Sequence, residues 1–138
     1  MQQKQCFNYY VLLLGLMASI VLIFPPKLCK ADAVAARLEK AGSNKAAIVI
    51  NLKESAPSTL IVLLRMPSHI TIIKTTPRAN KINSKKGTIT WLLKNTVPGT
   101  LSVSFSSAQP FRLDDVSASI RYRDPNQGLA EIEAIRAN

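Results

Sequence analysis

Apolar and polar residues alternate with a period of two through most of the chain after residue 33, a pattern typical of strands with one buried face. Val116–Arg123 (VSASIRYR) alternates apolar residues with serine and arginine, and Ala46–Lys53 (AAIVINLK) ends with its apolar residues on one face. Thr59–Met66 (TLIVLLRM) is almost entirely apolar, as in a strand covered on both faces. The remaining segments of this kind are 69–75, 88–94 and 100–106. Six strands are therefore predicted.

Two further segments leave the element type open. Leu129–Arg136 (LAEIEAIR) fits a seventh strand, but its alanine and glutamate content is equally compatible with a helix. Val34–Ala41 (VAARLEKA) reads as one or two helical turns or as a first strand. Thr75–Lys86 (TTPRANKINSKK) is polar throughout and is expected to form a long loop.

Proline, glycine and asparagine separate the apolar segments. Proline presets φ, and glycine or asparagine accepts positive φ, so these residues favour turns. The stretch Val97–Gly99 is expected to close a hairpin between 88–94 and 100–106. Short strands with turns at this spacing and no long helix between them predict an all-β fold, an immunoglobulin-like antiparallel β-sandwich of about seven strands.

The first 33 residues differ from the rest of the chain. Val11–Phe24 is an unbroken apolar run that ends at Pro25-Pro26, and Ala31-Asp32-Ala33 carries small residues where a signal peptidase cuts. A helix of these fourteen residues spans about 21 Å, short of the hydrocarbon core of about 30 Å. We expect a signal peptide over 1–33 and one domain over 34–138, with an uncleaved anchor helix as the alternative.

Charge and cysteine content narrow the expected environment. Both cysteines, Cys6 and Cys29, precede the expected cut, so the domain would contain neither a disulfide nor a thiolate metal site. Residues 34–138 contain fifteen lysines and arginines and seven acids, a net charge of +8. Such an excess attracts polyanions such as acidic glycans or lipid headgroups. Nucleic acid is not expected as a partner of an exported protein.

Trp91 is the only tryptophan of the chain. In a strand over 88–94 its side chain shares a face with Ile89 and Leu93, while Thr88, Thr90 and Lys94 occupy the other face. The alternation therefore predicts a core position, where an aromatic side chain of this size stabilises the fold by about 2–3 kcal/mol. An exposed platform for sugar stacking is the alternative.

Side chains suited to catalysis or metal binding are sparse. His69 is the only histidine, and a lone histidine makes neither a metal site nor a catalytic dyad. Asp114 and Asp115 are adjacent, so in an extended chain they point in opposite directions and do not form an acid–base pair; weak calcium binding is their alternative role. Glu131 and Glu133 are expected to face solvent. We expect no enzyme activity, no cofactor and no metal.

The predicted loop over 75–86 is the candidate binding site of the chain. It carries Arg78, Lys81, Lys85 and Lys86 without any acid. Loops at the ends of β-sandwiches are common binding surfaces, and these four residues are the candidate site. Solubility of an exposed loop and protection of a sheet edge are the alternative explanation of the same charges.

The order LLRMPSHITIIKTTPRANKINSKKGTITWLL, PGTLSVSF and SASIRYRDPNQG resembles the immunoglobulin-like modules of bacterial and archaeal surface proteins, the DUF11-like and cohesin-like group. The resemblance rests on a proline at a strand end, a glycine before an Ile-x-Trp strand, a Pro-Gly turn and a late Tyr-x-Asp-Pro segment. It implies a spacer, adhesive or partner-binding role at a cell surface.

Two functions are expected from these observations. The first is an exported, non-enzymatic module in the periplasm, outside the cell or on its surface, which binds an envelope protein or an anionic envelope polymer or glycan. The second is a structural subunit of an envelope assembly, held in the membrane only by an uncleaved N-terminal helix and pairing its sheet edge with a neighbour.

Overall fold

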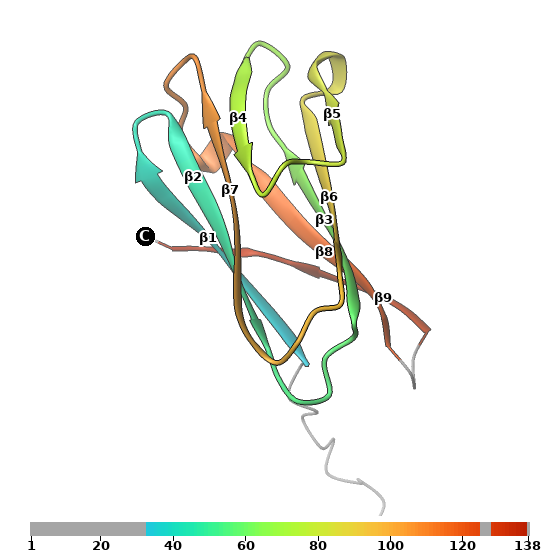
Figure 1. Ribbon diagram of the computed structural model, residues 1–138. Coiled ribbons are helices and arrows are strands. Elements are labelled where there is room, and N and C mark those ends of the chain that lie inside the picture. The colour runs from blue at the N-terminus through green and yellow to red at the C-terminus, as the bar shows by residue number, and fades with distance from the viewer. Residues whose placement is uncertain (1–32, 125–127, 138) are drawn as a thin grey trace, which may run out of the picture. The chain divides into compact units, whose positions relative to one another are not determined.

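The computed structural model describes residues 33–124 and 128–137, which form two five-stranded sheets packed face to face (Figure 1). The first sheet has the order β10–β1–β2–β7–β4, with β10 Ile135–Arg136, β1 Val34–Gly42, β2 Lys45–Leu52, β7 Gly99–Ser107 and β4 Ile72–Thr76. The second has the order β5–β6–β3–β8–β9, with β5 Lys81–Asn83, β6 Thr88–Lys94, β3 Thr59–Arg65, β8 Ser117–Asp124 and β9 Gly128–Glu133.

Two single 3-10 turns, η1 Ser84–Lys86 and η2 Leu113–Asp115, complete the structure, and the described residues contain no α-helix. The predicted all-β class and two-sheet packing are confirmed. The segment expected to be a signal peptide or anchor lies outside the described residues. Within the described ranges, no helix has the length and apolar content that a membrane crossing requires.

The core lies between the sheets and is built by the alternation seen in the sequence. In β2 the even-numbered residues from Ala46 to Leu52 are buried, and in β8 the buried residues are Ala118, Ile120 and Tyr122. Trp91 is 1% exposed, which confirms its predicted core position. Phe105 and Phe111 stack with their ring centroids 5.2 Å apart. Each fully buried Leu, Ile or Phe adds about 1.5–3 kcal/mol to the driving force for folding.

Both segments whose type the sequence left open are strands. In Val34–Gly42 the side chains of Val34, Ala36 and Leu38 are buried with exposed residues between them, and β1 pairs antiparallel with β2. Gly128–Glu133 pairs antiparallel with β8. Alanine, glutamate and lysine favour helix locally, but the open edges of β2 and β8 supply backbone partners that outweigh this preference.

The prediction of a long polar loop over 75–86 is wrong, because the segment contains two short elements. Lys81–Asn83 forms β5, which pairs with the edge of β6, and Ser84–Lys86 forms η1. The strand expected over 69–75 begins later, at Ile72. A strand of three residues is too short to show a periodicity in the sequence. It is stabilised by pairing with the edge of β6.

The hairpin expected around Val97–Gly99 is also wrong. β6 pairs with β3 and β5, whereas β7 pairs with β2 and β4, so the turn carries the chain from one sheet to the other. The apolar residues of both strands still face the interior, because alternation fixes the buried face but not the neighbouring strand.

The chain also passes between the sheets at both lateral sides of the sandwich. On one side residues 77–80 join β4 to β5, and on the other Ala134 joins β9 to β10 (Figure 1). β10 then pairs in parallel with β1, and the Ala137 N–H donates to the Leu38 carbonyl at 2.9 Å. The first crossing positions the candidate site.

Candidate functional site

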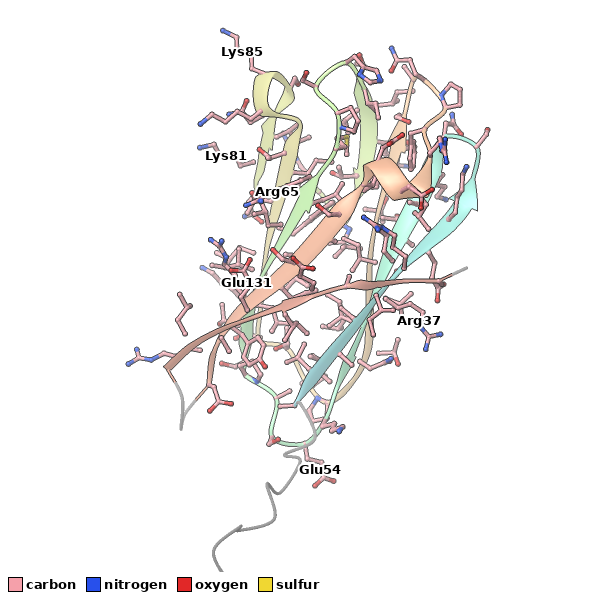
Figure 2. The ribbon with its side chains drawn as sticks, turned by 180° about the vertical axis from the view of Figure 1, so that it is seen from behind. Arg37, Glu54, Arg65, Lys81, Lys85 and Glu131 are labelled. Atoms are coloured by element: carbon pink, nitrogen blue, oxygen red, sulfur yellow. The ribbon has the colours of Figure 1, made fainter. Side chains whose placement is uncertain are left out.

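The four predicted cations follow one side of the sandwich, where β5 forms the edge of its sheet. All four are exposed: Arg78 in the crossing, Lys81 in β5, and Lys85 and Lys86 in η1. Figure 2 shows Lys81 and Lys85 extending from the ribbon on this side, whereas Glu54 lies at the opposite end of the domain. We call Arg78, Lys81, Lys85 and Lys86 the basic edge. They lie along an edge, and not in one loop as the sequence suggested.

The η1 turn that carries two of these lysines is held against the β3–β4 loop. Asn83 Oδ1 accepts a hydrogen bond from the Lys86 N–H at 3.1 Å, and the Met66 N–H donates to the Gly87 carbonyl at 2.8 Å. Gly87 has a φ of 59°, and a Cβ added there would lie 1.9 Å from the Met66 carbonyl oxygen. Only glycine fits this position, so the backbone beneath the two lysines is fixed.

The crossing that carries Arg78 is held by side chains at both of its ends. Thr75 Oγ1 accepts from the Ala79 N–H at 2.9 Å, and the Trp91 indole Nε1–H donates to the Pro77 carbonyl at 2.9 Å. Asn80 makes two further bonds with β6, its N–H donating to the Thr90 carbonyl and its Oδ1 accepting from the Leu92 N–H at 2.7 Å. The buried tryptophan therefore supports the segment from which Arg78 projects.

The basic edge lies in a region without acids. No aspartate or glutamate occurs between Glu54 and Asp114, an interval that includes β3 to β7. Ion pairs of the described residues include Arg37–Glu39, Arg112–Asp114 and Arg121–Glu131, and none of these three includes a residue of the basic edge. Unneutralised cations on one side of a domain create a positive potential that attracts anions.

The outer face of the second sheet continues this charge pattern. Arg65 of β3 is exposed and lies between Thr88 and Ser117 of the neighbouring strands. Figure 2 shows Arg65 between the basic edge and Glu131. Sequence reasoning did not include Arg65 in the site, although the acid-free interval between Glu54 and Asp114 would have indicated it.

At the β8–β9 end of the same sheet, an arginine is paired with a glutamate. Arg121 Nε lies 3.0 Å from Glu131 Oε2 across β8 and β9, although its N–H is poorly aligned with the carboxylate. The close contact with the Arg121 side chain lowers the pKa of Glu131 below its ordinary value of 4.5, and the Ser119 side chain and the charge of Arg65 act in the same direction. Glu131 therefore belongs to this pair and does not neutralise the basic edge.

A cavity of about 440 Å³ opens beside the crossing. It is bounded by the crossing, the second half of β6, the turn after it and the start of β7. The residues that line it include Arg78, Trp91, Leu93, Lys94 and Leu101. The sequence did not indicate this cavity, because it depends on β6 and β7 belonging to different sheets.

The other candidate side chains lie apart from the basic edge. His69 is exposed in the β3–β4 loop, and Asp114 lies in η2 with its Oδ2 3.3 Å from Arg112 Nη2. Glu131 and Glu133 are exposed, as predicted. No group of three potential metal ligands occurs within residues 33–124 and 128–137.

No protein-family model matches the chain, and no curated protein matches it. Among solved structures, the chain is similar to the chitin-binding domain of a hyperthermophilic chitinase from Pyrococcus furiosus, with 14% sequence identity and a TM-score of 0.42. The match covers 77% of this chain and 100% of that domain. A likeness at this identity and TM-score says nothing about what this chain binds.

Proposed function

We propose that the chain is an exported, non-enzymatic binding module of the cell envelope, which contacts an anionic polymer or an acidic surface through the basic edge. The observation that carries this proposal is the exposure of Arg78, Lys81, Lys85 and Lys86 in a region without acids. The apolar run before residue 25 supports the proposed location. The finer classification as an immunoglobulin-like surface module rests on the turn residues and strand pattern.

The arrangement suits a polymer better than a small anion. The cations lie along an edge and are held by a fixed turn at one end and a hydrogen-bonded crossing at the other. Repeated charges on a flexible chain can follow such an edge, and each contact adds a small increment of affinity. Trp91 is buried, so it offers no surface for stacking a sugar ring.

Binding to an immobilised polyanion tests this proposal. The probe is a heparin matrix, and the variant is Lys81→Gln, Lys85→Gln, Lys86→Gln. If each lysine contributes about 0.5 kcal/mol, as exposed ion pairs do, the variant binds about tenfold more weakly at about 0.15 M salt. The matched control is Lys40→Gln, Lys45→Gln, Lys53→Gln, which removes the same charge from exposed positions in and after β1 and β2.

The control separates a local surface from a net-charge effect. We expect it to retain most of the affinity of the unmodified chain. If the two triple variants weaken binding equally, the attraction belongs to the whole molecule and the basic edge is not a site. Far-ultraviolet circular dichroism of all three proteins verifies that the fold is retained.

A further inference from the structure

Part of β6 and part of β7 have no neighbouring strand on the side of the domain that carries the basic edge. β5 pairs with β6 only as far as Thr90, and β4 pairs with β7 only from Ser104 onwards. Figure 1 shows the β4–β5 connection crossing between the sheets while β6 and β7 continue beyond it. Within the described residues, 91–94 and 99–103 therefore have no strand on this side, and the cavity lies between them.

The open edge of β6 presents backbone groups that are free to pair. The Thr90 carbonyl accepts from Asn80, so it faces outward, and every second residue of a strand directs its amide groups to the same side. The Leu92 N–H also faces outward and is bonded to Asn80 Oδ1. The Leu92 carbonyl and the Lys94 N–H face the same way, and neither has a hydrogen-bond partner among the described residues.

These two groups match the bonding pattern of a parallel strand. In parallel pairing, one residue of the added strand donates its N–H to a carbonyl and accepts from the N–H two residues further along. The Leu92 carbonyl and the Lys94 N–H have this spacing. Pairing of this kind therefore needs no displacement of Asn80.

The cavity beside this edge suits apolar side chains of the added strand. Trp91 is buried, and Leu93 and Leu101 are half-buried on the two sides of the opening. Alternate residues of an added strand point to opposite faces, so every second side chain would enter the cavity. Covering Leu93 and Leu101 would add hydrophobic stabilisation to the backbone hydrogen bonds.

The charge around the opening indicates the chemistry of the partner. Arg78 and Lys94 are exposed at the cavity, and none of the described residues that line it is an acid. A second copy of the chain would oppose lysine to lysine and carry a net charge of the same sign. An acidic peptide avoids this repulsion and can place carboxylates beside both cations.

We propose that Leu92–Lys94 and the adjoining cavity form a site for an extended acidic peptide, which adds as a short strand to β6. Its apolar side chains enter the cavity beside Trp91, and its carboxylates contact Arg78 and Lys94. This site is distinct from the polyanion contacts of Lys81, Lys85 and Lys86, so the triple variant at those lysines should retain peptide binding.

A proline substitution separates backbone pairing from charge. The probe is a fluorescein-labelled, amidated peptide of alternating glutamate and valine, and its binding is followed by fluorescence anisotropy. Lys94→Gln removes one exposed charge and should weaken binding about threefold, whereas Lys94→Pro also removes the N–H and should weaken it about tenfold further. Proline is tolerated at an edge position whose N–H faces outward.

Two comparisons can overturn the proposal. Equal binding by Lys94→Gln and Lys94→Pro would exclude backbone pairing at this edge. Equal binding of a lysine–valine peptide would exclude the acidic partner. Thermal unfolding of each variant verifies the fold.

Amide hydrogen exchange gives a test that needs no substitution. Saturation of the unmodified chain with the glutamate–valine peptide should slow exchange of the Lys94 amide at least about tenfold, because a bonded amide is protected. The Leu92 amide, already bonded to Asn80, should change less. An unchanged exchange rate of the Lys94 amide would overturn the proposal.

Dimerisation of the free chain through this edge would also overturn it. Light scattering of the unmodified and Lys94→Pro proteins measures this dimerisation.

Discussion

Trp91 connects the core to the candidate site. Its ring is buried between the sheets, and its Nε1–H bonds to the Pro77 carbonyl, one residue before Arg78. Alternation in the sequence was sufficient to predict the buried side chain. The partner of the indole N–H was not predictable, because Pro77 lies in a segment with no periodicity and reaches Trp91 only through the crossing between sheets.

Substitution of Trp91 should separate the contributions of its buried ring and of its indole hydrogen bond to the stability of the fold. Trp91→Phe keeps an aromatic ring but leaves the Pro77 carbonyl without its donor, so we expect a loss of about 1–3 kcal/mol in the free energy of unfolding. Trp91→Ala should cost about 3–5 kcal/mol because it also leaves a cavity. Urea unfolding followed by circular dichroism measures both, and equal stability of Trp91→Phe and the unmodified chain would contradict the hydrogen bond's role.

Gly87 sets the position of the turn that carries Lys85 and Lys86. Gly87→Ala places a methyl group against the Met66 carbonyl in a left-handed backbone conformation. We expect a loss of about 1 kcal/mol from the backbone and about 1–3 kcal/mol more from the overlap. Gly128→Ala is the matched control, since Gly128 has a φ of 80° and nothing within 4 Å of an added Cβ. Equal losses in thermal unfolding would show that the contact with Met66 is unimportant.

Strands differ in how well the sequence predicts them. β2, β3, β6, β7 and β8 are long and alternate, or are almost wholly apolar, so their type follows from the pattern of burial. β1 and β9 have residues that favour helix, and pairing with an existing edge decides their type. β5 and β10 have three and two residues, and form because an edge is available to them. Neighbouring strands were not predictable, as the mistaken hairpin shows.

The pair between β8 and β9 predicts how stability depends on pH. The pKa of Glu131 is lowered in the folded chain, so its contribution to stability is present above the ordinary value of 4.5 and is lost as pH falls through the folded value. Glu131→Gln should therefore have a lower Tm than the unmodified chain at neutral pH, and the difference should vanish in acid. Glu133→Gln, on the same face of β9, is the control and should show a smaller difference. A Tm difference that persists well below pH 4.5 would exclude the ion pair as its cause.

At the scale of the whole molecule, acids are absent from the middle of the chain, whereas lysines and arginines occur throughout residues 37–136. The acid-free interval from β3 to β7 includes the basic edge, whereas Glu131, Glu133, Asp114 and Asp115 belong to the later part of the chain. The sequence indicated the four basic residues but not their arrangement. Arg78 lies in the crossing between the sheets and Lys81 lies in β5, and neither the crossing nor β5 was predictable from the sequence pattern. Residues 34–138, with a net charge of +8, also attract polyanions without any local site, so only a comparison at constant net charge isolates the basic edge.

The salt dependence of polyanion binding therefore tests the central claim most directly. Affinity for heparin is measured over a range of salt concentrations for the unmodified chain, the variant at Lys81, Lys85 and Lys86, and the control at Lys40, Lys45 and Lys53. Lost contacts at a binding surface flatten the dependence of log affinity on log salt, because fewer counterions are exchanged. We predict a flatter dependence for the first variant and a dependence close to that of the unmodified chain for the control. Equal flattening in both variants would contradict the basic edge as a binding surface.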